Sequence, residues 1–249
     1  EEVNDELKGL LKTGGIKPKP LMVCSGGTSS RCAAEGHWTL DLRKKYQQID
    51  FNLANNTVEV GAGITMEKLL KKLAKYGRSF PSGLSGLTGL GYILTGGISP
   101  LSRSQGLAID QVIKINGIWG RGDTFSVSKP DNSSNPEDQL IWRALCGAAP
   151  FLSIITKLTL KTQPLTPLKV WQSYLEKEDL SKAIQQAENW PNSLSLQWIW
   201  GDKIKVYGII AKNIEISDEI LQKLKREFPF SKSLEISDIF GLQDIPTFT

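Results

Sequence analysis

Six glycines fall within fifteen residues near the middle of the chain, and no other feature limits its fold as strongly. They are Gly83, Gly86, Gly89, Gly91, Gly96 and Gly97. Each glycine weakens a helix or strand by roughly 0.5–1 kcal/mol relative to alanine, so the segment from Arg78 to Val112 is expected to form neither. Glycine also lets the backbone approach a flat or charged ligand with its N–H groups uncovered. A bound cofactor is one explanation of the cluster, and tight turns between short strands are the other.

A second loop, Cys24-Ser25-Gly26-Gly27-Thr28-Ser29, lies upstream of the glycine cluster. It follows the apolar run Leu21–Cys24, which predicts a buried strand. Its successive N–H groups and hydroxyls are the donors that a pyrophosphate needs. A plain turn explains this loop equally well when it is taken alone, but two such loops in one chain favour a shared ligand.

Composition excludes several classes of protein. The 249 residues suffice for one large domain or two modest ones, and 40% of them are hydrophobic. The net charge of +4 is dispersed without a basic run, so no nucleic acid is expected as a partner. No apolar stretch approaches the roughly 20 residues of a membrane span, so no membrane partner is expected either. The three cysteines, Cys24, Cys32 and Cys146, have spacings that suit no disulfide framework, which predicts a cytoplasmic protein.

Two further patterns argue against particular kinds of catalytic or cofactor site. His37 is the only histidine, so a zinc site built on histidines, a Ser-His-Asp triad or a Cys-His dyad would have to use it. No nucleophile lies at motif spacing from His37, which is expected on the surface. No metal site is expected. Gly61-Ala62-Gly63 imitates a Rossmann fingerprint, but Met66 occupies the third glycine position and no acidic residue follows at the required spacing. A nicotinamide dehydrogenase is therefore set aside.

The first 165 residues alternate between predicted strands and helices. A helix is expected over residues 2–12, a second one after Thr65, and a third from Asn135-Pro136-Glu137 to Gly147. Strands are expected at 38–42, 57–60, 112–115 and 154–161, the last with the alternation of an edge strand. Asn116-Gly117 predicts a tight hairpin turn, and residues 120–138 predict mostly loop.

The character of the sequence changes around Gln163–Pro167, where a domain boundary is placed. Beyond it, the pattern predicts a helix with Leu180 and Ala187, a hairpin of two strands turning at Gly201-Asp202, and a helix from Ser217. Trp198 and Trp200 share one strand face and are expected to pack in the core. Two strands seldom form a stable sheet alone, so this part is expected to be an incomplete substrate domain.

Taken in order, six segments resemble a known flavoprotein family. They are Ser25-Gly26-Gly27, Val60-Gly61-Ala62-Gly63, Phe80-Pro81-Ser82-Gly83, the glycine run to Gly97, the segment from Pro100 to Asp110, and Trp142-Arg143-Ala144-Leu145. This series resembles the FAD-binding fold of p-cresol methylhydroxylase (PCMH) and vanillyl-alcohol oxidase, most closely its berberine-bridge-enzyme-like branch. The resemblance covers roughly residues 1–165 and continues weakly beyond them.

The resemblance implies an α+β fold: a PCMH-type FAD-binding domain of two α/β subdomains over 1–165, then part of an α+β substrate domain over 166–249. It implies FAD as cofactor, with the pyrophosphate on the first loop and the ribityl chain and flavin along the glycine-rich stretch. The implied cofactor-binding residues are Ser25, Gly26, Gly27, Thr28, Ser29, Pro81, Ser82, Gly83, Gly89, Gly91, Tyr92, Gly96, Gly97, Ser102 and Ile155. The implied reaction is hydride removal from an alcohol, sugar or hydroxy acid, with oxygen or another acceptor as the second partner.

The sequence also departs from the family. Many relatives attach the flavin covalently through a histidine where this chain has Thr28, or through a cysteine where it has Leu84 or Ser85, so a noncovalent flavin is expected. Relatives carry a glycine-rich turn where this chain has Ala148, Ala149 and Pro150, and no residue matches a catalytic base. Two alternatives therefore stay open: a degenerate, non-catalytic binding or interaction protein on the same scaffold, and a reductase related to a cell-wall precursor enzyme.

Overall fold

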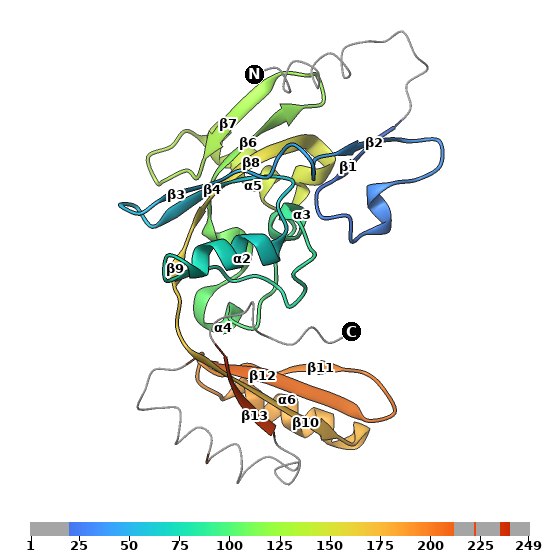
Figure 1. The fold of residues 1–249 in the computed structure, drawn as a ribbon, viewed down its shortest axis with the longest axis vertical. Helices are drawn as coiled ribbons and strands as arrows, with labels where there is room; N and C mark the ends of the chain where they lie inside the picture. Colours follow the sequence, from blue (N-terminus) through green and yellow to red (C-terminus); the bar gives the residue numbers. More distant parts are fainter. Residues whose placement is uncertain (1–19, 212–221, 223–234, 240–249) are drawn as a thin grey trace.

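The computed structural model of the protein describes residues 20–211, 222 and 235–239. The helix expected over residues 2–12 and the start of the one expected at Ser217 lie outside this description. The described chain forms two separate sheet regions joined by one extended connection (Figure 1).

The first strand pair carries the first of the two predicted loops. β1 (Leu21–Cys24) and β2 (Trp38–Asp41) pair in parallel, from Leu21 opposite Trp38 to Cys24 opposite Asp41. The short 3₁₀ helix η1 (Ser30–Cys32) lies in the segment that connects them. The predicted strand at Leu21–Cys24 is confirmed, but its predicted burial holds only for Cys24. The loop leaves directly from the end of this strand.

A five-stranded antiparallel sheet forms the centre of the larger region, in the order β3-β4-β8-β6-β7. Its strands are β3 (Ile49–Asn52), β4 (Thr57–Gly61), β8 (Ser153–Lys161), β6 (Val112–Trp119) and β7 (Thr124–Ser128). The prediction that residues 154–161 form an edge strand is wrong, because β8 pairs with β4 and β6 on its two sides. Alternating polar side chains indicate that one face of a strand is partly exposed to solvent. They do not indicate whether the edges of the strand are paired with other strands.

The predicted hairpin turn at Asn116-Gly117 is also wrong. β6 runs through both residues, and the chain turns at Gly120–Asp123, where the Gly122 N–H donates to the Trp119 carbonyl at 2.8 Å. Gly117 is required by packing, because a Cβ there would lie 2.7 Å from both the Phe125 ring and the Ile154 carbonyl oxygen. The returning strand β7 occupies part of the segment that was expected to be mostly loop.

Helices cover one face of this sheet and share its core. They are α2 (Met66–Ala74), α3 (Leu90–Leu94) and α5 (Pro136–Leu152). The apolar face predicted for α2 is confirmed, since Met66, Leu69, Leu70 and Leu73 are all buried. Shorter elements complete the region: β5 (Arg78–Ser79), α4 (Ser102–Gln105), η2 (Ala108–Gln111) and β9 (Gln163–Pro164).

α5 begins as the sequence predicts and ends later. The Asn135 side chain accepts a hydrogen bond from the Asp138 N–H, and Pro136 is the first helical residue. The helix breaks at Cys146 and Gly147, where Gly147 has a φ of 125°, and a second helical segment continues to Leu152. Gly147 therefore marks a kink between two helical pieces, and the second piece brings Pro150 and Phe151 beside β1 and α3.

The second region is a four-stranded antiparallel sheet in the order β11-β12-β10-β13, with α6 packed on it. Its elements are β10 (Leu168–Leu175), η3 (Lys177–Asp179), α6 (Leu180–Glu188), β11 (Gln197–Ile199), β12 (Ile204–Ala211) and β13 (Glu235–Ile239). The predicted helix and hairpin are confirmed, and β10 and β13 are two strands more than expected. Trp198 and Trp200 are 40% and 65% exposed, so the prediction that they pack in the core is wrong.

Contacts join the two regions across the connection. Leu168, Val170 and Ile209 of the second sheet belong to the core of the first region. The Arg103 guanidinium of α4 donates to the carbonyls of Ala187 and Trp190, both at 2.6 Å. The α+β class is confirmed, and the boundary placed at residue 165 falls in the connection between β9 and β10 and stays a prediction. Among the described helices, none is long and apolar enough to cross a membrane.

Candidate functional site

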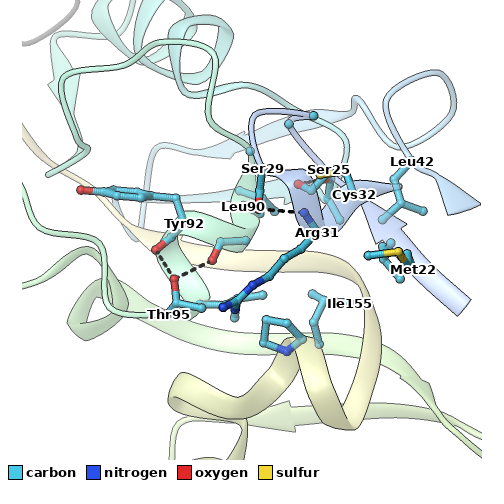
Figure 2. Close-up of a pocket in the computed structure, with 18 of the residues that line it drawn as sticks. Met22, Ser25, Ser29, Arg31, Cys32, Leu42, Leu90, Tyr92, Thr95 and Ile155 are labelled. Atoms are coloured by element: carbon cyan, nitrogen blue, oxygen red, sulfur yellow. Dashed lines mark hydrogen bonds between the residues drawn. The ribbon is translucent and has the colours of Figure 1, made fainter. Parts of the chain in front are cut away.

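A pocket of about 590 Å³ opens between three segments that are far apart in the sequence. The first runs from β1 through the loop to η1, the second from Thr88 into α3, and the third from the end of α5 to Ile155 in β8 (Figure 2). This volume is within the usual range for a site that holds a cofactor or small molecule.

The two glycine loops meet at the side of this pocket. A Cβ on Gly26 would overlap the Gly89 backbone nitrogen and lie 2.9 Å from the Leu87 carbonyl oxygen, so neither loop has room for a side chain at the crossing. The Ser25 hydroxyl donates to the Ala62 carbonyl at 2.5 Å and ties the first loop to the segment after β4. The convergence on which the shared-ligand prediction depends is therefore present in the structure.

The first loop presents hydrogen-bond donors that the protein itself does not use. Within the described part of the chain, the backbone N–H groups of Gly27, Thr28 and Ser29 take part in none of the hydrogen bonds. The Ser29 hydroxyl oxygen accepts from the Arg31 N–H at 3.2 Å, which leaves its proton free to donate, and the Thr28 hydroxyl is exposed. Free amides and hydroxyls gathered on one loop fit an anionic group such as a pyrophosphate.

Much of the remaining wall of the pocket is apolar. Its apolar residues include Leu21, Met22, Val23, Leu42, Ala62, Leu90, Leu94 and Ile155. Gly91 also lines the pocket, and a Cβ placed on it would meet no atom within 4 Å, so the space beside it is open. An apolar wall next to a small set of polar donors is the usual lining of a site for a small molecule or cofactor.

The third segment carries the residues that depart most from the resembled family. Pro150 and Phe151 both line the pocket, and Phe151 is 76% exposed. Pro150 has no N–H to offer a ligand, and its ring fixes the local backbone. The third segment therefore contributes side-chain surface to the pocket, but Pro150 offers the ligand no backbone N–H.

Nine of the fifteen predicted cofactor-binding residues line this pocket. They are Ser25, Gly26, Gly27, Thr28, Ser29, Gly89, Gly91, Tyr92 and Ile155. The other six, Pro81, Ser82, Gly83, Gly96, Gly97 and Ser102, do not line it. A role for any of the fifteen in holding the cofactor remains a prediction.

The residues outside the pocket support its second segment. A Cβ on Gly83 would lie 2.7 Å from the Tyr92 hydroxyl, and one on Gly97 would lie 2.5 Å from the Ala108 Cβ. The Tyr92 hydroxyl donates to the Ile98 carbonyl, and burial raises the pKa of Tyr92. Gly83 and Gly97 thus allow the backbone to close around the Tyr92 ring, which fixes α3 beside the pocket.

Sequence reasoning missed several pocket residues, above all Arg31 and Cys32 of η1 and Thr95 after α3. Cys32 also contacts the buried Cys24, whose thiol pKa is raised by burial and by the Cys32 thiol. A signal was available for Arg31, because it is a cationic residue two positions after a loop assigned to a pyrophosphate. The single histidine, His37, is exposed as predicted and does not line the pocket.

Comparison with protein families and curated proteins gives consistent matches. Residues 2–128 match the family described as FAD binding domain. The FAD-linked oxidoreductase janO of Penicillium janthinellum is 33% identical over 155 residues, which cover 59% of this chain and 32% of that protein. Berberine bridge enzyme-like 11 of Arabidopsis thaliana is 27% identical over 242 residues, which cover 88% of this chain and 45% of that protein.

Solved structures share the fold. Xylooligosaccharide oxidase from Myceliophthora thermophila superposes with a TM-score of 0.81 at 18% identity, covering 95% of this chain and 52% of that one. Glucooligosaccharide oxidase from Acremonium strictum, with a 6-S-cysteinyl, 8α-N1-histidyl FAD, gives a TM-score of 0.78 at 19% identity, covering 94% of this chain and 52% of that one.

This chain spans about a third to a half of the length of these relatives. The family match covers more than half of the chain and includes both loops of the pocket. The described sheets and helices agree with the PCMH-type fold of the structural neighbours. The chain therefore belongs to the FAD binding domain family, within the berberine-bridge-enzyme-like branch of the PCMH-type flavoproteins, and its cofactor is FAD.

Proposed function

We propose that this chain is the cofactor-binding part of an FAD-linked oxidase or dehydrogenase that removes a hydride from an alcohol, sugar or hydroxy acid, with the FAD held noncovalently. One observation carries the proposal: the two glycine loops meet at one pocket, and the first presents free N–H groups to it. FAD, when bound, supplies the hydride acceptor, and oxygen or another acceptor reoxidises it.

Different residues of the chain would bind different parts of the cofactor. The amides of Gly27–Ser29 and the hydroxyls of Thr28 and Ser29 would hold the pyrophosphate. The apolar wall formed by β1, α3 and Ile155 would exclude water from a flat part of the cofactor. Gly89 and Gly91 would allow the backbone of the second segment to approach it without side chains.

A noncovalent flavin is supported by the residues at the attachment positions. Thr28 lines the pocket where covalent relatives have histidine, and a threonine hydroxyl is a far weaker nucleophile than an imidazole or a thiolate. Leu84 and Ser85 likewise offer no thiolate. The test is to saturate the purified chain with FAD, precipitate it with acid, and measure flavin absorbance in the supernatant and pellet. We expect all of the flavin in the supernatant. A protein pellet that stays yellow would contradict noncovalent binding of the flavin.

The donor class is supported by structural neighbours that are named as oligosaccharide oxidases. The test is anaerobic incubation of the FAD-loaded protein with xylooligosaccharides, simple alcohols or hydroxy acids, followed by admission of air. Loss of flavin absorbance, with recovery in air, is expected for one class. The same assay run with NADPH examines the reductase alternative, since bleaching by NADPH alone would favour that function.

A degenerate binding protein remains the second candidate, and one observation favours it. Pro150 and Phe151 line the pocket at the place where the resemblance implies a glycine-rich turn. That function predicts weak or absent FAD binding, and no bleaching by any donor. A cytoplasmic location belongs to the same set of proposals, and its support is that the described cysteines are free thiols.

A further inference from the structure

Arg31 is a charged residue of the pocket that the glycine loops do not explain. It belongs to η1, directly after the first loop, and its backbone N–H donates to the Ser29 hydroxyl oxygen at 3.2 Å. In Figure 2 its side chain runs from η1 into the pocket, in the direction of Thr95. Among the described residues that line the pocket, it is the only one with a charged side chain.

The Arg31 guanidinium has no partner among the described residues. It takes part in none of their ion pairs, and its hydrogen bonding is limited to the backbone N–H. A guanidinium carries five N–H donors in a planar fork that matches two phosphate oxygens at once. The Arg31 guanidinium points into the pocket and has no counter-ion among the described residues. It is therefore suited to bind an anionic group of the ligand.

A second cation beside the first loop, Arg43, is already paired with a carboxylate. The Arg43 guanidinium forms a two-point pair with Asp41, with Nε to Oδ1 at 2.9 Å and Nη2 to Oδ2 at 2.7 Å. Arg43 lies against Gly27 and does not line the pocket. The loop amides supply partial charges only, so within the described part of the chain Arg31 is the one full positive charge that the pocket lining brings to a diphosphate.

We propose that Arg31 binds the diphosphate of FAD and supplies the counter-charge that the loop of Ser25–Ser29 lacks. This inference rests on the proposed function, since it assumes that FAD occupies the pocket. It adds a residue that glycine patterns do not predict. It also gives the chain an ionic contact to a cofactor whose flavin is not covalently attached at Thr28.

The experiment compares wild type with Arg31→Gln and Arg31→Lys by titration of FAD and of riboflavin, followed by isothermal calorimetry or flavin fluorescence. Arg31→Gln is expected to bind FAD roughly tenfold more weakly, the lower end for a charged hydrogen-bonded contact, because Arg31 is exposed. Arg31→Lys keeps the charge without the fork and should fall between the two. Riboflavin has no phosphate, so its affinity should not change.

Two controls separate charge from damage to the fold. Arg121→Gln removes an exposed arginine from the turn between β6 and β7, outside the pocket, and should bind FAD as wild type does. Raising the salt concentration should weaken FAD binding in wild type more than in Arg31→Gln, because ions screen the Arg31 charge. Melting temperatures of all the variants should agree.

Three results would overturn the proposal. An unchanged FAD affinity in Arg31→Gln would show that the guanidinium does not touch the diphosphate. An equal loss of FAD and riboflavin would show a distorted pocket. A wild-type chain that binds no FAD would end the proposed function and this inference together, whereas Arg31→Gln binding FAD as tightly as wild type would end only this inference.

Discussion

Gly26 and Gly89 lie in direct backbone contact, although 62 residues separate them in the sequence. A Cβ on Gly26 would overlap the Gly89 nitrogen, and a Cβ on Gly89 would overlap the Ser25 hydroxyl and the Gly26 nitrogen. The crossing is backbone against backbone, so no side-chain rotation can relieve a clash there. It holds two of the three pocket segments together.

Gly26→Ala and Gly89→Ala should each force the loops apart. We expect a loss of about 1–3 kcal/mol in the free energy of unfolding, typical of an overpacked site, together with weaker FAD binding. Denaturant unfolding and FAD titration measure the two effects. Gly120→Ala is the matched control, because a Cβ there meets no atom within 4 Å. If Gly26→Ala matched the stability and FAD affinity of the control, the crossing would not matter to the pocket.

The sequence predicted the pairing of the two loops better than it predicted the sheets around them. The loops were recognisable because glycine and hydroxyl residues have few other uses at such density. The hairpin assigned to Asn116-Gly117 failed because a glycine that makes room for Phe125 looks, in sequence, like a glycine that makes a turn. The true turn depends on Gly122, which has a positive φ of 90°. The polar residues on either side of Gly122 did not indicate that the turn lies there.

The exposure of Trp198 could not be derived from its strand pattern. Residue parity places Trp198 opposite Val206 on one face of the sheet, but coverage of that face depends on α6 and the sheet edge. β11 is the outer strand of its sheet and has three residues, so Trp198 lies at the margin and Trp200 lies beyond it. Arg31 was missed for a similar reason, since the direction of its side chain is set by η1, a 3₁₀ turn that the sequence does not announce.

Cys32 should report on occupancy of the pocket. It lines the pocket and is partly exposed, whereas Cys24 is 4% exposed and burial raises the pKa of its thiol. Because the thiolate is the reactive form, a thiol-alkylating reagent should label Cys32 before Cys24. Saturating FAD should slow labelling of Cys32, as measured by mass spectrometry of the peptides.

Cys146 serves as the internal control for that experiment. It does not line the pocket, so its labelling rate should be the same with and without FAD. Equal protection of Cys32 and Cys146 would indicate a general tightening of the fold, and no protection of Cys32 would place the cofactor away from η1.

Arg103 should hold α4 against the end of α6. Its two nitrogens donate to the Ala187 and Trp190 carbonyls at 2.6 Å each, across the connection between the two sheet regions. Arg103→Ala leaves both carbonyls without this donor and should cost about 1–3 kcal/mol of unfolding free energy. Hydrogen exchange near residues 187–190 should rise, while FAD affinity should stay close to wild type because Arg103 does not line the pocket.

Arg143→Ala is the comparison for this variant, since Arg143 is an exposed arginine on α5. It should leave both stability and exchange unchanged. A loss of stability in Arg103→Ala without faster exchange near residues 187–190 would mean that the guanidinium acts within α4 and not between the two regions.

The Asp41–Arg43 pair should give the protein a small acid-sensitive contribution to stability. Hydrogen bonds from the Arg43 side chain and backbone lower the pKa of Asp41 to about 2, against about 3.9 for an unperturbed aspartate. A carboxyl whose pKa is lowered on folding stabilises the fold above its unfolded pKa and loses that effect as the pH falls through its folded pKa. Both side chains are partly exposed, at 35% and 48%, so solvent screening limits the contribution to about 0.5–1 kcal/mol.

Asp41→Asn should therefore be less stable than wild type at neutral pH by about 0.5–1 kcal/mol, and the difference should vanish as the pH falls from about 4 to about 2. Denaturant unfolding of both proteins across this range measures the difference. Asp50→Asn is the control, because Asp50 is exposed on β3 and forms no ion pair among the described residues. A difference between Asp41→Asn and wild type that persisted at the acid end would mean that the substitution acts through β2 packing, since the charge of Asp41 is gone there.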